Sequence, residues 1–122
     1  MRRGADMFDC ILPTALATQG VAFTSLGKVD LRRGVYRSVN SPLDKDCPCR
    51  TCQRFTRAYL HHIVKAKESI VQQHISIHNL TFYRYLMYRM RQAILGNSFS
   101  ELYSKEANNI AAMDLEFPTV TE

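Results

Sequence analysis

Three cysteines within six residues constrain this chain more than any other feature. The sequence CPCRTC begins at Cys47 and ends at Cys52, with Cys49 between them. Disulfides need specific separations between Cα atoms, so three such close thiols are poorly placed to pair with one another. Thiolates are common ligands of Zn²⁺, which takes four protein ligands in a tetrahedral structural site. The cluster therefore predicts a zinc site whose fourth ligand returns from elsewhere in the chain.

The fourth ligand can come from a histidine or from Cys10. His78 lies 26 positions after the last cysteine of the cluster, where an antiparallel pair of helices would return the chain to its starting point. His74 has a similar spacing and remains an alternative. His61 and His62 are less suitable, because helical rise alone carries them about 14 Å away from the cysteine turn. Spacing thus favours His78 and leaves His74 open.

Such a site would be structural rather than catalytic, because four protein ligands leave no position for an activated water. Its role would be to order residues 38–52, which contain two prolines and show no hydrophobic periodicity. The competing interpretation is a set of buried free cysteines. Three cysteines so close together in a polar segment make that interpretation unattractive.

Hydrophobic periodicity predicts the remaining elements. Strands are expected at 5–12, 21–25 and 28–33, with a loop at 13–20, a turn at Leu26-Gly27 and extended chain at 34–36. Helices are expected at 53–69, at 76–95 with Ser76 as N-cap, and at 98–105 with a capping box formed by Ser98 and Glu101. The predicted apolar stripe of the second helix comprises Leu80, Tyr83, Met87, Met90 and Ile94. From residue 107 onward the chain is expected to fray.

Composition excludes some classes of protein and leaves others open. No apolar run approaches the roughly 18 residues that a membrane span needs, and acidic residues interrupt any secretory signal near the amino terminus. We therefore expect a cytoplasmic protein without a membrane partner. The formal net charge is +5, from 16 Lys and Arg against 11 Asp and Glu. Basic residues cluster at 50–67 and 83–91 with tyrosines among them, which is permissive for nucleic-acid binding without being diagnostic.

Several motifs in order resemble one known family. The run GADMFDCILPT, from Gly4 to Thr14, resembles the segment of tRNA-guanine transglycosylases (queuine or preQ1 tRNA-ribosyltransferases) that carries the catalytic nucleophile. The resemblance continues through PLD at 42–44, the cysteine cluster, TRAYLHH at 56–62 and IHNL at 77–80, and extends to about residue 104. Several independent motifs in the right order make chance similarity very unlikely.

The resemblance implies a fold and a set of metal ligands. The fold would be α/β: the C-terminal part of a (β/α)8 TIM barrel with an inserted zinc-binding subdomain of short strands and two to three helices. Terminal barrel strands with the nucleophile loop and hairpin would occupy 1–37, the zinc-binding subdomain 38–80, and C-terminal helices with a tail 81–122. The zinc ligands implied are Cys47, Cys49, Cys52 and His78.

The resemblance also implies an activity. Asp9 would match the nucleophile that attacks C1′ of the guanosine at the wobble position of a tRNA anticodon loop. Guanine would leave and a 7-deazaguanine base, preQ1 or queuine, would replace it. Replacement with retention requires a double displacement through a covalent intermediate, for which a carboxylate is suited. Asp6 is expected to make a structural hydrogen bond at the start of its strand, and Cys10 to be a buried neighbour.

Two departures from the family limit that expectation. Ala15 and Thr18 stand where many bacterial members carry arginines that bind the anticodon. A complete (β/α)8 barrel needs roughly 250 residues, so this chain of 122 residues lacks most barrel strands. We therefore expect it to be inactive alone, and to form a homodimer or to pair with the missing N-terminal part. The alternatives are a non-catalytic, zinc-stapled tRNA-binding or subunit-interaction module, and a remnant without function.

Overall fold

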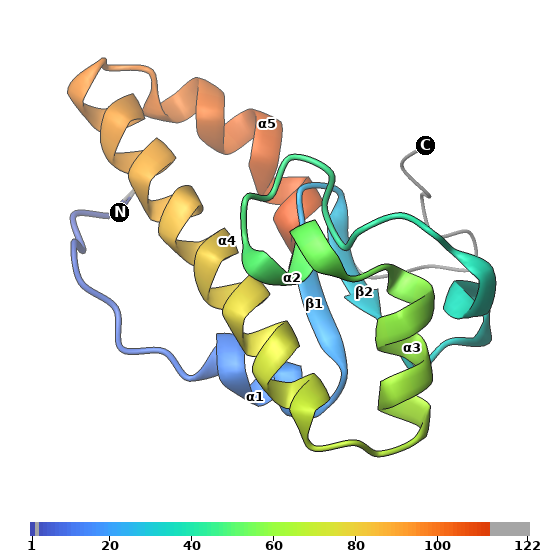
Figure 1. The fold of residues 1–122 in the computed structure, drawn as a ribbon. Coiled ribbons are helices and arrows are strands. Elements are labelled where there is room, and N and C mark those ends of the chain that lie inside the picture. Colours follow the sequence, from blue (N-terminus) through green and yellow to red (C-terminus); the bar gives the residue numbers. More distant parts are fainter. Residues whose placement is uncertain (2, 113–122) are drawn as a thin grey trace.

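Helix α4 (Ile70–Leu95) is the longest element of the described residues, and most of the other elements contact it. The computed structural model describes residues 1 and 3–112 (Figure 1). In chain order the elements are α1 (Leu12–Thr18), β1 (Val21–Thr24), β2 (Gly27–Asp30), the 3-10 helix η1 (Gly34–Ser38), α2 (Arg50–Arg54), α3 (Arg57–Lys65), α4 (Ile70–Leu95) and α5 (Phe99–Ala111). Helix α1 and strand β1 both contact α4.

The two strands form one antiparallel hairpin, as the sequence predicted, but its turn is Ser25-Leu26 rather than Leu26-Gly27, and the second strand ends at Asp30 rather than at residue 33. Val21 pairs with Asp30 and Thr24 with Gly27, so the turn has two residues. Gly27 has φ +129°, and a Cβ there would lie 3.1 Å from the carbonyl oxygen of Ala112, so the turn requires glycine. Every residue of β1 is buried, because α4 covers one face of this strand.

The core lies between the hairpin, α3 and the first half of α4. Its buried members are Ala17, Ala22, Val29, Leu31, Tyr36, Leu43, Leu60, Ile63 and Ile75. Burial of these apolar side chains, each worth about 1.5–3 kcal/mol when large, is the main source of stability. The core therefore holds the loop at 38–49 between the hairpin and α3.

The amino-terminal segment differs from the prediction. Residues 5–11 lie in no helix or strand and are exposed, so the strand predicted at 5–12 is wrong for this chain. An extended segment becomes a strand only where a neighbouring strand accepts its hydrogen bonds. Within residues 1 and 3–112 the hairpin is the only sheet, and it does not pair with this segment.

Most of the loop predicted at 13–20 is helical, because α1 runs from Leu12 to Thr18 and only Gln19 and Gly20 form a turn. Pro13 occupies the first turn of α1, where a missing N–H costs nothing. Ala15, Leu16 and Ala17 follow, and alanine and leucine are strong helix formers. The loop was predicted because these residues are small. A helix of seven residues is also too short to show a clear hydrophobic periodicity.

The middle of the chain needs two further corrections. Gly34–Ser38 is a 3-10 helix, where extended chain was predicted. The helix predicted at 53–69 is divided into α2 and α3, because Thr56 interrupts it as an N-cap. The Oγ1 of Thr56 accepts a hydrogen bond from the N–H of Tyr59 at 3.2 Å, which satisfies one donor at the start of α3.

Helix α4 begins six residues before the predicted start at Ser76. Val71 and Ile75 pack on the core and extend the buried face toward the amino end, so Ser76 lies inside the helix. The buried face comprises Ile75, His78, Asn79, Leu86 and Ala93. Of the predicted stripe, Leu80 and Ile94 are exposed, so the predicted face was rotated from the observed one.

Helix α5 begins one residue after Ser98, close to the prediction, but extends to Ala111. Ser98 makes no side-chain cap hydrogen bond, so the predicted capping box is not formed. A salt bridge from Arg89 to Glu106 joins α5 to α4. Residues 107–111 are helical where fraying was expected, and the rest of the predicted tail, 113–122, lies outside the described residues.

The fold class is α/β, as expected. The described part of the chain holds one two-stranded sheet and no barrel, so the (β/α)8 expectation stays a prediction. The expected boundary at residue 80 falls inside α4. None of the described helices is both long and apolar enough to span a membrane.

Candidate metal centre

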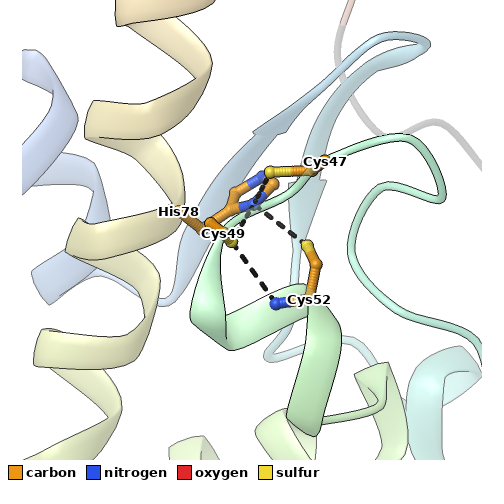
Figure 2. A group of neighbouring side chains, drawn as sticks. All are labelled: Cys47, Cys49, Cys52 and His78. Carbon is orange, nitrogen blue, oxygen red and sulfur yellow. Dashed lines mark hydrogen bonds between the residues drawn. The ribbon is translucent and has the colours of Figure 1, made fainter.

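Four side chains from two separate parts of the chain meet beside the hairpin. Cys47, Cys49 and Cys52 come from the loop before α2 and from α2 itself, and His78 points at them from α4 (Figure 2). The Nδ1 atom of His78 lies 3.5 Å from Sγ of Cys47, 3.6 Å from Sγ of Cys49 and 3.2 Å from Sγ of Cys52. All four ligand atoms lie within 4.8 Å of one another.

These distances fit a tetrahedral metal ion. Zinc binds thiolate sulfur at about 2.3 Å and imidazole nitrogen at about 2.0–2.1 Å, which places the two kinds of ligand about 3.6 Å apart in a tetrahedron. The observed separations of 3.2–3.6 Å between nitrogen and sulfur match that edge. Three sulfurs and one imidazole are also a donor set that selects zinc over hard cations such as Mg²⁺.

Local backbone geometry brings the cysteines together. Cys49 is the N-cap of α2, and its Sγ accepts a hydrogen bond from the N–H of Cys52 at 3.3 Å. The N–H of Cys47 donates to the carbonyl oxygen of Asp44 at 3.3 Å, which turns the chain before the cluster. A helix N-terminus favours negative charge, so this arrangement stabilises thiolates.

Strand β1 fixes the orientation of His78. Its Nε2 donates to the carbonyl oxygen of Phe23 at 2.5 Å, which leaves Nδ1 with its lone pair toward the sulfurs in the neutral ring. The next residue, Asn79, accepts a hydrogen bond from the N–H of Phe23 at 2.9 Å. His78 and Asn79 are both fully buried. In metal-binding histidines, a hydrogen bond from the ring nitrogen that does not bind the metal sets the tautomer and the direction of the ring. The bond from Nε2 of His78 to Phe23 is of this type.

Further contacts attach the cysteine loop to the rest of the fold. The carboxylate of Asp44 accepts from the backbone N–H of Ser25 at 2.8 Å, which ties the loop to the hairpin turn. The buried guanidinium of Arg57 donates to the carbonyl oxygens of Pro42 and Leu43, at 3.0 and 2.7 Å. The sequence predictions did not single out Arg57 or Asn79 for these roles. Polar residues on otherwise apolar helix faces were the signal that could have found them.

The electrostatics of the centre favour a cation between the ligands. Hydrogen bonds with Cys47 and Cys52 hold the pKa of the Cys49 thiol far below its usual range. Hydrogen bonds with Cys47 and Cys49, together with burial, raise the pKa of the Cys52 thiol. Burial lowers the pKa of His78, but hydrogen bonds to the sulfurs outweigh burial and raise it to about 9. Metal ligands must be deprotonated, so an ion bound here would take the place of a proton on the imidazole and on the thiols.

The other histidines lie away from the sulfurs. The ring of His74 packs on Phe55 with centroids 4.5 Å apart, and its backbone carbonyl accepts from Thr51 Oγ1 at 2.7 Å. Burial, aided by the charge of Arg50, lowers the pKa of His74. His61 bonds through Nδ1 to the carbonyl oxygen of Leu31. Of the two histidines that spacing allowed, the fold therefore brings only His78 to the cysteines.

The predicted nucleophile does not belong to this centre. Asp9 is exposed and lies, with Cys10, along a groove of about 980 Å³ between the amino-terminal segment and helices α4 and α5. Asp6 is exposed in a segment without a strand, and Cys10 is exposed rather than buried, which corrects that expectation. Burial, with the nearby Cys10 thiol, raises the pKa of Tyr83 across the groove.

Comparison with known proteins decides the family. A family model described as "Queuine tRNA-ribosyltransferase" matches residues 1–112, which include the cysteine cluster, His78 and Asp9. The chain belongs to the queuine tRNA-ribosyltransferase family. The resemblance inferred from the sequence motifs is thereby confirmed. The cluster of three cysteines and His78 is thus a feature of a chain of this family.

Curated queuine tRNA-ribosyltransferases show the same relationship. The protein of Solidesulfovibrio magneticus is 49% identical over 100 residues, and that of Francisella tularensis subsp. tularensis is 48% identical over 99 residues. These alignments cover 82% and 81% of this chain but 27% of each relative. The protein of Idiomarina loihiensis is 42% identical over 118 residues, or 93% of this chain and 32% of the relative. The chain therefore spans less than a third of the length of these relatives.

Proposed function

We propose that this chain corresponds to the zinc-bearing C-terminal part of a tRNA-guanine transglycosylase and carries its nucleophile, Asp9. The observation that supports this most strongly is the convergence of three thiols on Nδ1 of His78. That centre lies within a chain matched from residue 1 to residue 112 by the family model. The activity belongs to the complete enzyme, of which this chain supplies one part.

Cys47, Cys49, Cys52 and His78 would hold the zinc ion. With four protein ligands the ion is structural: it crosslinks the cysteine loop to α4 and takes no part in the reaction. Through the bond from His78 to Phe23, the same crosslink extends to the hairpin. The binding free energy of the ion therefore stabilises the folded arrangement of α2, β1 and α4.

The chemistry assigned to Asp9 is a double displacement. Its carboxylate forms a bond to C1′ of the wobble ribose while the glycosidic bond to guanine breaks, and guanine leaves with the bonding electron pair. A ring N–H nitrogen of the incoming 7-deazaguanine then attacks C1′ and displaces the carboxylate, which restores the original configuration. The proton that this nitrogen loses balances the proton that the departing guanine anion takes up. The transition states resemble an oxocarbenium ion, whose positive charge a nearby carboxylate stabilises.

The surroundings of Asp9 support its accessibility but not an assembled catalytic site. The groove beside Asp9 is mostly apolar and is lined by Phe8, Tyr83, Leu86, Met87, Met90, Phe99 and Tyr103, among others. Groups that would recognise the base or the anticodon are expected in the two thirds of the relatives that this chain does not span. Pairing with that remainder would also supply strand partners for residues 5–11. We favour this pairing over a homodimer as the route to activity.

Exchange of labelled guanine into unmodified tRNA tests the proposal. The zinc-loaded chain alone should incorporate no label. Incorporation should appear when the chain is mixed with a polypeptide covering the remainder of a relative, and should disappear with Asp9→Asn, which keeps the size but removes the nucleophile. Asp6→Asn is the matched control and should retain exchange. Exchange by the chain alone, or exchange that survives Asp9→Asn, would refute the proposal.

One observation favours a second candidate, a non-catalytic tRNA-binding or subunit-interaction module. The segment that carries Asp9 is exposed and has no strand partner among the described residues, whereas the four candidate metal ligands lie together. A module of this kind would bind tRNA in a salt-dependent way, and Asp9→Asn would leave that binding unchanged. Failure of every mixture to exchange guanine, with tRNA binding retained, would favour this candidate.

A further inference from the structure

A second pocket, separate from the metal centre, is lined by residues from the end of α1, from the segment after β2 and from the turn between α3 and α4. The end of α1 and the turn between α3 and α4 lie at the same end of the molecule (Figure 1). Its volume is about 510 Å³, within the range of about 300–1,000 Å³ that small-ligand pockets occupy. None of the four candidate metal ligands lines it, and neither does Asp9. The pocket therefore has no part in the function proposed so far.

Positive charge and hydrogen-bond donors dominate the lining. Arg32, Lys65 and Lys67 contribute three cations, against the one carboxylate of Glu68. The amide groups of Gln19 and Gln72 and the hydroxyl of Ser69 add further donors. The apolar lining consists of two valines, and there is no aromatic side chain on which a base could stack. This lining suits an anionic group rather than a nucleobase.

Arg32 is held in place by its neighbour Asp30. Its Nε and Nη2 donate to the two carboxylate oxygens at 2.8 and 2.7 Å, and the guanidinium holds the pKa of Asp30 below its usual range. These bonds use one edge of the planar guanidinium, so Nη1 on the other edge can donate elsewhere. Asp30 offsets the charge of Arg32, so Lys65 and Lys67 supply the net positive charge.

Lys67 occupies a backbone position that favours glycine. It has φ +57° and ends α3 in the left-handed region. The N–H of Glu68 donates to the carbonyl oxygen of Ile63 at 3.1 Å, and that of Lys67 to Val64 at 3.1 Å, which is the Schellman arrangement. Glycine adopts this left-handed conformation with less strain than lysine. The backbone turn therefore gives no reason for a lysine at position 67, whereas its side chain lines the pocket.

We propose that the pocket defined by Arg32, Lys65 and Lys67 binds phosphate groups of an RNA backbone. The inference rests on the proposed function, which makes tRNA the partner. Two lysines and one positioned guanidinium can contact adjacent phosphates, while the hydroxyl and amide groups bond to the riboses. Contacts of this kind position the RNA and carry no base specificity.

Binding of a stem-loop RNA with guanosine at the wobble position, measured over a range of salt concentrations, tests the pocket. The zinc-loaded 122-residue chain should bind with an affinity that falls as salt rises. Lys65→Gln combined with Lys67→Gly removes two cations. It should weaken binding about 5- to 10-fold and reduce the slope of log K against log salt by about 1.4, since each lost single-strand phosphate contact contributes about 0.7.

Lys67→Gly alone separates binding from folding. Glycine suits the left-handed position, so this variant should unfold at the same or a higher denaturant concentration and still bind RNA more weakly. Asn97→Gly changes a residue with a similar φ of +54° outside the pocket and should leave binding unchanged. Lys45→Gln with Lys105→Gln removes the same charge elsewhere and should change the salt slope less than the pocket variant.

The outcomes separate this inference from the function on which it rests. If the unaltered chain fails to bind the RNA, the pocket is refuted, whereas guanine exchange by the mixture with the remainder of a relative decides the tRNA partnership separately. If the unaltered chain binds and the pocket variants bind with the same affinity and salt slope, only the pocket is refuted. A loss confined to the pocket variants, with folding intact, supports both.

Discussion

The Nε2 atom of His78 donates a hydrogen bond of 2.5 Å to the carbonyl oxygen of Phe23, while Nδ1 of the same ring lies among three cysteine sulfurs. One imidazole thus joins strand β1 to the cysteine loop. The ring cannot rotate without losing a buried hydrogen bond, so the direction of Nδ1 is set before any metal binds. The metal centre and the hairpin are therefore expected to form and unfold together.

Replacement of a single cysteine should abolish metal binding. Cys52→Ser removes the sulfur nearest to Nδ1 of His78, at 3.2 Å. The purified chain should carry about one zinc per molecule, and the variant close to none when measured by atomic emission. Cys10→Ser is the matched control, because Cys10 is exposed and lies outside the cluster. Zinc retained by Cys52→Ser at the unaltered stoichiometry would contradict the assignment of this ligand.

Removal of the metal with a chelator should loosen the cysteine loop more than the hydrophobic core. The amide of Cys52 donates to Cys49 Sγ, and α2 has only five residues, so little else stabilises this segment once the metal is gone. Hydrogen exchange should accelerate most at 44–54 and least around Ile75, which is fully buried. Added zinc should reverse the change. Uniform acceleration throughout the chain would show instead that the metal supports the whole fold.

Asn79→Ala should destabilise the chain by about 3 kcal/mol, because it leaves buried backbone groups without partners. The Asn79 side chain accepts from the N–H of Phe23 and donates to the carbonyl oxygens of Pro13 and Val21. Urea unfolding at fixed zinc concentration measures the change. Asn108→Ala, in an exposed position of α5, is the control and should stay within about 0.5 kcal/mol. A change of similar size in both variants would argue against the role given to Asn79.

Arg57→Lys should also destabilise the fold, by about 2 kcal/mol, although the charge is kept. The guanidinium is buried, reaches the carbonyl oxygens of Pro42 and Leu43 together and lies 5.8 Å from the ring centre of Tyr36. A lysine ammonium cannot reproduce this planar pair of bonds. Thermal unfolding of Arg57→Lys should show the loss, whereas Arg54→Lys at an exposed position should unfold like the original chain.

Local sequence patterns predicted the local features of the structure. The hairpin was found from two short β-rich runs around a turn, and the turn glycine has the conformation that the pattern requires. Helices α4 and α5 were predicted, but some of their ends were wrong. Ser76 was interpreted as an N-cap although the helix extends past it to bury Ile75, and Ser98 makes no side-chain cap hydrogen bond. Thr56 was missed as a cap in the same way, so α2 and α3 were merged.

Long-range features were beyond those patterns. Arg57, Asn79 and Asp44 hold the loop and the hairpin through partners between 14 and 66 positions away, and no local period records such pairs. The segment at 5–12 has the composition of a strand but no strand beside it in the described chain. Its conformation depends on a partner rather than on its own residues, as strand formation generally does.

The sequence by itself determined the chemistry that is available: three thiols in one turn, a histidine at a compatible distance along the chain, and the motifs of the family. Residue type and short spacing are covalent properties, so they can be read without a fold. Only the tertiary structure decided which histidine meets the sulfurs. The packing of α4 on β1 turns His78 toward them and places His74 against Phe55, because the direction of a side chain is set by what its helix packs against.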